Sequence, residues 1–562
     1  MSKLIYVISR VGDNLSKERL ELIEKRITPD NLSPNPLKII TDVNSICAIF
    51  NYVSTIQING SSVCLGYSPN NNWDELDVRA DEIEGSFVIF RNNKEKFQVV
   101  TDCVESRTLW YYFDDNLFIA STSQRAIITY LGSFRFNEQV IPWMLSSGTP
   151  GPGLSYDKRI KMLEPNSLVT LNKNSWSVNI DEKYFEIKQT IVDRNEAKKM
   201  LHKALKTSFD SYSFDNSKIG LPLSGGYDSR AILLYLNNSD LLRTITWGTA
   251  ESRFVRTNDA YIAAQLSNSF GLVNHFFESY NGNVPVKEVL SRFINCSEGR
   301  IDHVRGYLDG MNMWKAIFEE GYECILRGDE EFGDGAPRSE LSERGSKALI
   351  TLDDFTNTKT LRKKVKLKKQ EIPKRLKYSN YSEKNYWVGR LAFDYDTKAI
   401  YSALNDIKLS YVEIVEPLLS SSILKTIASN YNASFTENKN LYKELIEEQY
   451  SFPFALQGAN KPLKDFLNTS ELINLFIETF SDSSAKVFVP VGLLEYTINR
   501  LKKQKQFHSL NEFVSWFFYR AIPKLITGNT KKLEMDWRVF ALRLYILIET
   551  CKMMEEDSKS NC

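Results

Sequence analysis

Histidine is scarce in this chain of 562 residues, and a histidine-based metal centre is not expected because the four histidines are scattered at His202, His275, His303 and His508. The seven cysteines are odd in number and none has Cys-x-x-Cys spacing. This argues against a disulfide framework or a zinc site and favours a reducing compartment. The sequence also lacks a long apolar run of about 18 residues and has a polar start, so we expect a cytoplasmic protein without a membrane span.

Net charge is nearly absent as well, since 71 Lys and Arg residues face 70 Asp and Glu residues. A surface that binds polyanions over the whole molecule is therefore excluded. One local exception is the range 359–377, which holds ten basic residues and one acidic residue. We interpret it as a solvated surface helix or an insertion; the alternative is a patch that binds an acidic peptide or nucleic acid.

The apolar fraction of 42% and the charged fraction of 25% are typical of a soluble globular protein and exclude a mainly disordered chain. Residues up to about 185 consist of short apolar runs separated by turns, such as Phe87–Phe90 and Lys96–Thr101, which predict antiparallel strands. From Asn195 onward, strand and helix patterns alternate, which predicts a parallel doubly wound sheet. We therefore expect two domains, at 1–190 and 191–562.

One loop carries most of the chemical information: Leu223-Ser224-Gly225-Gly226-Tyr227-Asp228-Ser229-Arg230, between a predicted strand and a predicted helix. Two glycines let the backbone approach a phosphate, and the hydroxyls, the amides and the helix N-terminus attract it. Asp228 would repel phosphate unless a Mg²⁺ ion lies between them. The loop lacks the Gly-Lys-Ser/Thr ending of a Walker A motif. Leu223, Ser224, Gly225, Gly226 and Ser229 are thus predicted to bind a nucleotide phosphate.

A second acidic segment, Arg327-Gly328-Asp329-Glu330-Glu331-Phe332-Gly333, follows the apolar strand that ends at Leu326. Ligands bind at the carboxyl ends of strands in open α/β sheets. We therefore predict that Asp228 and Asp329 share Mg²⁺ and that Arg327 and Gly328 line the nucleotide site.

Both segments resemble motifs of known enzyme families. Ser224 to Ser229 is similar to the pyrophosphate loop of ATP pyrophosphatases, which cleave ATP between the α and β phosphates. The segment at 327–333 resembles the Asp-Glu-x-Phe-Gly motif of asparagine synthetases. Further segments resemble that family in the same order, both in the N-terminal half, at 84–90, 102–112 and 120–127, and in the C-terminal half, at 244–248, 412–419 and 460–463.

The resemblance to the asparagine synthetase family implies an α+β N-terminal nucleophile-hydrolase-like sandwich followed by an α/β doubly wound parallel sheet of the adenine nucleotide α-hydrolase-like type. It implies ATP and Mg²⁺ as cofactors, with Trp247 at the adenine. By the same resemblance, Lys461 would stabilise charge during amide formation. Glu413 would orient a group or act as a base, and a structural ion pair is an equally good interpretation of it.

The sequence departs from the family at its start, where Ser2 stands in place of the cysteine nucleophile, and it lacks an Arg-Gly-Pro-Asp segment. We therefore expect residues 1–190 to lack glutaminase activity. β-Lactam synthetases and lasso-peptide macrolactam synthetases share this architecture without glutaminase activity. In both, an amine on the same substrate attacks the adenylate. Such intramolecular attack is favourable because it has a high effective molarity. The expected activity is an AMP-forming carbon–nitrogen ligase of natural product biosynthesis.

Three alternatives stay open: ammonia-dependent amidation of a small metabolite, a nucleotide-binding pseudoenzyme, and a tRNA-modifying enzyme with the same loop. Arg230 in place of a serine and the shortened second motif motivate the pseudoenzyme. The expected partners are a small-molecule or peptide carboxylate and a precursor peptide or partner biosynthetic enzyme. Nucleic acid is not an expected partner.

Overall fold

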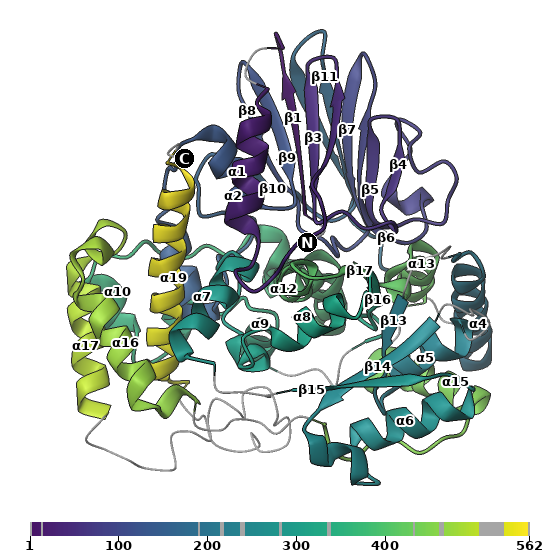
Figure 1. Cartoon of the computed structure of the whole chain (residues 1–562). Helices are drawn as coiled ribbons and strands as arrows, with labels where there is room; N and C mark the ends of the chain where they lie inside the picture. Colours follow the sequence, from purple (N-terminus) through teal and green to yellow (C-terminus); the bar gives the residue numbers. More distant parts are fainter. Residues whose placement is uncertain are drawn as a thin grey trace.

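The computed structural model describes residues 3–559 apart from 13–14, 189–191, 214–218, 237–241, 280–283, 334–338, 431–432, 460–465 and 505–532. The described residues form two six-stranded antiparallel sheets near the N-terminus and a five-stranded parallel sheet later in the chain (Figure 1). This confirms that antiparallel and parallel sheets occur together, as expected. The last antiparallel strand ends at Glu182 and the first parallel strand begins at Ile219, whereas the domain boundary at 190 stays a prediction.

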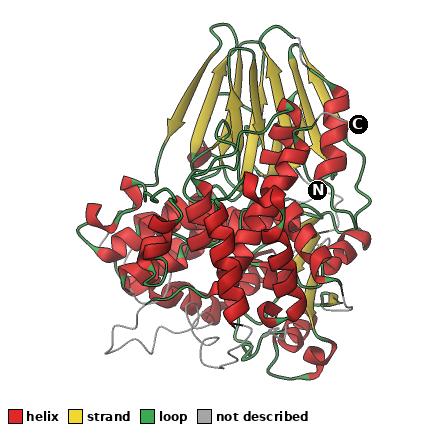
Figure 2. Ribbon diagram, turned by 90° about the vertical axis from the view of Figure 1, so that its left-hand side faces the viewer, coloured by secondary structure: helices red, strands yellow, loops and turns green. Residues whose placement is uncertain are grey.

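The two antiparallel sheets stack face to face, because residues of both share one apolar cluster. Figure 2 shows their strands together on one side of the mainly helical part of the chain. Side chains of successive strand residues point to opposite faces, so Leu4, Tyr6 and Ile8 pack between the sheets while Ile5 and Val7 face outward. The first sheet has the order β10-β8-β9-β1-β3-β2, with bounds Lys161–Met162, Trp110–Phe113, Leu117–Ser121, Lys3–Ser9, Ser45–Phe50 and Lys38–Asp42. The second has the order β12-β11-β7-β6-β5-β4, with bounds Ser177–Glu182, Ser167–Asn172, Lys96–Thr101, Ser86–Asn92, Ser62–Tyr67 and Gln57–Asn59.

Helices cover the outer face of the first sheet, which agrees with the α+β fold expected for this region. Helix α1 (Lys17–Ile27) buries Leu20, Ile23 and Ile27, which recur at helical spacing. Helix α2 (Gln124–Leu131) begins at Ser123, whose hydroxyl accepts from the Ala126 amide. The C-terminal helix α19 (Trp537–Asp557) packs against α2 and α3 (Val140–Ser147).

Helices from later in the chain cover the outer face of the second sheet. Phe87 and Val100 belong to one apolar cluster with residues of α4 (Arg194–Asp210) and α13 (Ser421–Ser429). Helix α4 begins at Asp193, whose carboxylate accepts from the amides of Asn195 and Glu196. Helices therefore pack against residues on the outer faces of both sheets.

The parallel sheet has the order β15-β14-β13-β16-β17. Its strands are β13 (Ile219–Pro222), β14 (Leu242–Gly248), β15 (Asn274–Glu278), β16 (Cys324–Leu326) and β17 (Glu413–Val415). Helices α5 (Tyr227–Leu236) and α6 (Asp259–Ser269) follow β13 and β14. From β13 the chain adds β14 and then β15 on one side. It then returns to the other side of β13, where it forms β16 and then β17. Such a reversal opens a crevice at the carboxyl ends of the central strands.

The remaining described helices surround this sheet. A ten-residue π-helix at Ala392–Tyr401 leads directly into α12 (Ser402–Leu409). The others are α7 (Val286–Ser297), α8 (Asn312–Glu319), α9 (Glu340–Ser346), α10 (Lys359–Lys364), α11 (Lys384–Leu391), α14 (Ala433–Thr436), α15 (Asn440–Gln449), α16 (Ser470–Ser481) and α17 (Val491–Gln504). Among the described helices, none has the length and apolar composition that crossing a membrane requires.

Candidate functional site

The loop at 223–226 joins the carboxyl end of β13 to the N-terminus of α5, where the sequence predicted it. Its hydroxyls organise it: the Ser224 amide donates to Ser229 Oγ at 3.0 Å, and the Gly226 amide donates to Ser224 Oγ at 3.2 Å. Leu223 is buried, and its carbonyl accepts from Thr246 Oγ1 at 3.0 Å, which ties the loop to β14. The result is a fixed turn of donors at a helix N-terminus, a setting that suits an anion.

Gly225 lies directly beneath a second loop. A Cβ atom on Gly225 would lie 2.5 Å from the Cβ of Ala455 and 3.0 Å from its amide nitrogen. The Gly225 amide donates to Asp259 Oδ1 at 2.5 Å, so a carboxylate oxygen occupies one of the donors that a phosphate oxygen would use. Burial raises the pKa of Asp259, and this amide opposes the rise.

We expect Gly225→Ala to weaken binding of ATP about 10- to 100-fold, because overpacking against Ala455 costs about 1–3 kcal/mol and displaces the loop. Gly226→Ala is the matched control, since its Cβ would meet only Ser224 Oγ, at 3.2 Å, and binding should change by less than about threefold. Isothermal titration with Mg²⁺-ATP measures both. Equal effects of the two variants would contradict the assigned role of the Gly225–Ala455 contact.

Arg230, which stands in place of a serine of the resembled motif, holds the covering loop. Its guanidinium donates to the carbonyls of Phe452 and Pro453, both at 2.8 Å, and lies 3.8 Å from the centre of the Phe454 ring. The substitution therefore has a structural reason: Arg230 fixes the segment that contacts Gly225.

The acidic segment after β16 contacts this loop, as predicted from the carboxyl ends of adjacent strands. A Cβ atom on Gly328 would lie 3.0 Å from Asp228 Cβ, so only glycine allows the two segments to approach this closely. The side chains of Asp228 and Asp329 lie close enough to interact electrostatically, because the negative charge of Asp329 raises the pKa of Asp228.

Lys439 joins the two segments, and the sequence analysis missed it. Its ammonium lies 3.1 Å from Asp228 Oδ2 and also pairs with Glu330. Burial raises the pKa of Asp228 and raises that of Glu330 to about 7, and Lys439 opposes both shifts. Lys439 and Asn438 both have positive φ, at 57° and 54°, just before α15. Such strain at consecutive non-glycine residues is typical of functional sites.

Asp329 turns toward the other side of the segment, where it meets Arg327 and Glu416. Arg327 Nη2 lies 3.4 Å from Asp329 Oδ1, and Asp329 Oδ2 is buried with no hydrogen-bond partner among the described residues. Burial raises the pKa of Glu416 far above its usual value and Asp329 adds to this, while Arg327 lowers the pKa of Asp329 against the effect of burial. Asp329 and Glu416 are therefore neighbouring buried carboxyl groups, and the ionised form is favoured for Asp329 and disfavoured for Glu416.

Glu413 does not lie with this group. It begins β17, at the opposite end of the strand from Glu416, and its buried carboxylate pairs with Arg107 of the N-terminal region. Arg107 Nη2 also donates to the Ile414 carbonyl at 2.7 Å. Of the two interpretations left open for Glu413, the geometry favours the structural ion pair over the base.

Trp247 and Lys461 are the two remaining residues that the sequence assigned to the site. Trp247 is half-buried near the end of β14 and packs edge-on against Trp314, with ring centres 5.5 Å apart. Lys461 lies outside the described residues, as does Ser2. The described part of the chain contains no group of three or more His, Cys, Asp or Glu side chains arranged to hold a metal ion.

The start of the chain is fixed to the region after α7. Lys3 Nζ lies 2.8 Å from Glu298 Oε1, and both side chains are almost fully buried. The Glu298 carboxylate also accepts from Ser123 Oγ and from the Gln124 amide at 2.9 Å, so it caps the N-terminus of α2. The residue after position 2 thus belongs to a buried network that joins the first sheet to the C-terminal region.

The basic range 359–377 begins with the predicted surface helix, α10, and its later residues lie beside the segment at 138–164, which contains α3 and β10. Lys368 lies 3.4 Å from Glu138, Arg375 pairs with Glu164, and Arg362 lies 2.9 Å from Asp353. Gln370 Nε2 donates to Ser146 Oγ at 2.7 Å. The range is therefore anchored on several sides, while most of its lysines are exposed.

No protein-family model matches the chain, and no curated protein matches it significantly in sequence. Among solved structures, the chain is similar to one described as the allosteric regulatory enzyme of purine biosynthesis, with 10% identity and a TM-score of 0.21 over 49% of this chain and 80% of that one. It is also similar to glutamine phosphoribosylpyrophosphate amidotransferase from B. subtilis, complexed with ADP and GMP, with 8% identity and a TM-score of 0.20 over 49% and 81%. Likenesses this low identify no family.

Proposed function

We propose that the chain is an ATP-dependent amide-forming ligase that activates a carboxylate as its adenylate and releases pyrophosphate. One observation carries the proposal: the donor-rich loop at 223–226 and the acidic segment at 327–330 touch through Gly328 and Asp228 at the carboxyl ends of β13 and β16. Phosphate donors and carboxylates that need a cation therefore meet in the crevice of an open parallel sheet.

The charges at this contact fit a divalent cation. Asp228, Glu330 and Asp329 contribute three carboxyl groups. Lys439 supplies one positive charge to Asp228 and Glu330, and Arg327 supplies one to Asp329, which leaves one negative charge in excess. Asp329 Oδ2 has no hydrogen-bond partner among the described residues, so one carboxylate oxygen could still accept a positive partner. Mg²⁺ binds through one or two carboxylates together with substrate phosphates, so a preformed cage of three ligands is not required. When bound, Mg²⁺ would neutralise the phosphates; Asp228 and Asp329 are the residues we assign to it.

The protein groups then have separate tasks. The hydroxyls of Ser224 and Ser229 would hold the β and γ phosphates. The amides of Ser224 and Gly226 would exchange their hydroxyl acceptors within the loop for phosphate oxygens, and Lys439 would exchange its carboxylate partners for them. The substrate carboxylate attacks the α phosphorus and pyrophosphate leaves. An amine then attacks the acyl carbon, and AMP leaves with the bonding electrons of the acyl–oxygen bond. Fixed donors and cations stabilise the charge that develops in both steps.

The attacking amine is the second part of the proposal. With Ser2 in place of a cysteine and Lys3 locked to Glu298, the region 1–190 would serve as a scaffold without glutaminase activity. The amine would then come from the substrate itself, a small molecule or a peptide, because intramolecular attack has a high effective molarity.

The experiment is ATP–pyrophosphate exchange with the full chain over a panel of amino acids, short peptides and metabolite carboxylic acids. We expect exchange that depends on one class of carboxylate and on Mg²⁺. Binding of ATP without exchange across the panel would favour the pseudoenzyme, for which the pairing of Lys439 with Asp228 and Glu330 is the supporting observation. Glutamine should not support amide formation under any of these conditions.

A further inference from the structure

The lysine-rich segment at 359–377 takes no part in the proposed nucleotide site. It holds ten basic residues, one acidic residue and no aromatic residue. Figure 1 shows its helix α10 beside α17 at one edge of the molecule, on the opposite side from α5, which follows the loop at 223–226. The charge of this segment is therefore separate from the groups assigned to ATP.

Buried side chains fix the segment to the rest of the molecule. Leu361, Leu367 and Leu376 are buried, and Gln370 Nε2 donates to Ser146 Oγ at 2.7 Å. The lysines stand between these anchors, and all eight of them are exposed. They therefore project from a backbone that is already held, which lowers the entropy that a binding partner must supply to order it.

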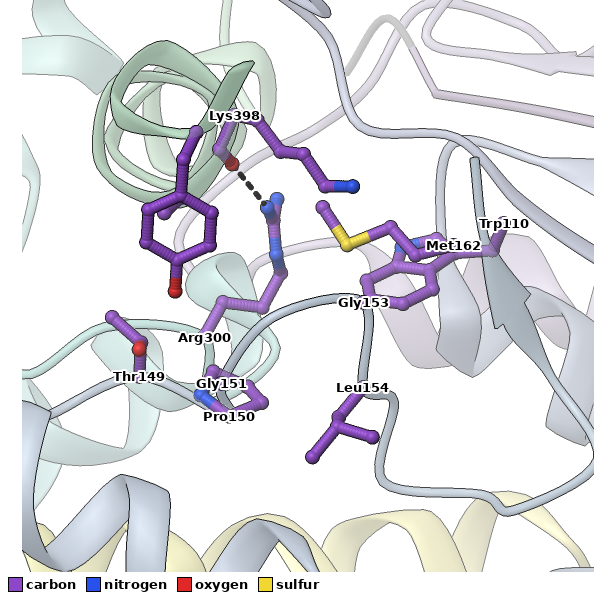
Figure 3. A pocket seen from close by; sticks show the side chains of 11 residues that line it. Trp110, Thr149, Pro150, Gly151, Gly153, Leu154, Met162, Arg300 and Lys398 are labelled. Atoms are coloured by element: carbon purple, nitrogen blue, oxygen red, sulfur yellow. Dashed lines mark hydrogen bonds between the residues drawn. The ribbon is translucent and has the colours of Figure 1, made fainter. Parts of the chain in front are cut away.

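The two arginines of the segment differ from the lysines, because both are half-buried and paired. Arg362 lies 2.9 Å from Asp353, and Arg375 pairs with Glu164. Glu164 Oε1 also lies 3.0 Å from Lys398 Nζ, and Figure 3 shows the Lys398 side chain, which is 2% exposed, among those that line a small pocket. The carboxylates beneath the segment are thus engaged with these cations and do not neutralise the exposed lysines.

Few carboxylates compensate the lysines at the surface. Within the part of the chain that the structure describes, Lys368 is the one lysine of the segment with an ion pair, and its partner is the exposed Glu138 at 3.4 Å. Such an exposed pair contributes less than about 1 kcal/mol, so a ligand can replace it. Glu371 is the one carboxylate of the segment itself. The result is a strongly positive surface on a chain whose net charge is only +1.

The side chains of this surface favour one class of polyanion. Single-stranded nucleic acid binds through aromatic or arginine side chains on which bases stack, and the segment offers no aromatic residue and no unpaired arginine. Stable attachment to a membrane takes an apolar signal besides the charge, and the leucines of the segment are buried. Separate ammonium groups along one stretch of chain match carboxylates that are spaced along a peptide.

We propose that the exposed lysines of the segment at 359–377, the lysine surface, bind an acidic segment of a partner peptide or protein. The carboxylates of the partner pair with the ammonium groups, and no residue of the proposed adenylation site takes part. Charge complementarity of this kind accelerates association and weakens as salt is added. The binding does not depend on whether the chain adenylates a carboxylate.

The test measures the fluorescence anisotropy of a labelled peptide of about ten residues that alternates glutamate and glycine, mixed with the full chain at low salt. We expect a Kd of about 1–100 μM, and binding that is at least about tenfold weaker at about 0.3 M salt. The same peptide with glutamine in place of glutamate should bind at least about tenfold more weakly.

A pair of double variants locates the binding. Lys363→Gln/Lys366→Gln removes two charges from the lysine surface and should weaken the glutamate peptide at least about fivefold. Lys199→Gln/Lys203→Gln removes two exposed lysines from α4 and should change binding by less than about twofold, although it alters the net charge equally. All four side chains are exposed, so thermal melting should be unchanged in both variants.

Four results would overturn the proposal. The first is no binding of the glutamate peptide to wild-type protein up to about 1 mM at low salt. The second is equal binding of the glutamine peptide, and the third is an equal loss of binding in the two double variants. The fourth is displacement of the peptide at lower concentration by a short RNA hairpin or by phosphatidylserine vesicles, which would assign the lysine surface to nucleic acid or to a membrane. A failure of ATP–pyrophosphate exchange would contradict the proposed function alone.

Discussion

Asp228→Asn is expected to lower ATP–pyrophosphate exchange by at least about 100-fold while the protein stays folded. Asparagine keeps the shape of the side chain but loses the charge that would hold Mg²⁺ beside the loop. The side chain is 33% exposed, so losing its ion pair with Lys439 should cost little stability. Thermal melting checks the fold, and the exchange assay measures the activity.

The matched control for this variant is Asp210→Asn, at the exposed end of α4, which should exchange at the wild-type rate. If Asp228→Asn keeps more than half of the wild-type exchange, Asp228 does not take part in adenylation and the proposed mechanism fails. Weakened binding of ATP with an unchanged exchange rate at saturation would also contradict the assignment, since the charge would then act only in binding.

The second large effect concerns stability. Arg107→Met should lower the free energy of unfolding by about 3–5 kcal/mol, because it leaves the fully buried Glu413 carboxylate without its cation. The double variant Arg107→Met/Glu413→Leu should recover most of this loss, since replacing a buried ion pair by apolar residues is often neutral. Chemical denaturation of the full chain measures each step.

An exposed ion pair provides the control for the stability experiment. Lys315→Ala breaks the pair between Lys315 and Glu319 on the surface of α8 and should cost less than about 1 kcal/mol. A variant of Glu413 that changes activity but not stability would contradict its assignment to a structural ion pair. If Glu413→Gln abolished exchange without changing the melting temperature, Glu413 would act in the chemistry and the structural interpretation would be wrong.

The location of the candidate site could be predicted from local sequence. Two glycines and two serines between a buried strand and a helix indicate a phosphate loop at 224–229, and Gly328 follows the next strand of the sheet. Because parallel strands end at one edge, the contact between Gly328 and Asp228 follows from those two positions.

Other parts of the site depend on tertiary structure. Lys439 reaches Asp228 across 211 residues of sequence, and nothing in its polar surroundings distinguishes it from a surface lysine. In the segment at 412–419, the sequence offers two glutamates, and only the register of the short strand β17 shows that Glu416 lies with Asp329 while Glu413 faces Arg107. The helices α1 and α2 were missed because they are short and lie among strong strand patterns.

The account depends most directly on which bond of ATP is cleaved. Phosphorus NMR of Mg²⁺-ATP incubated with the full chain and the carboxylate panel measures this in one spectrum. The account predicts AMP and pyrophosphate in equal amounts, formed only with a carboxylate that is consumed. Formation of ADP and phosphate, or ATP that stays intact across the whole panel, would contradict it.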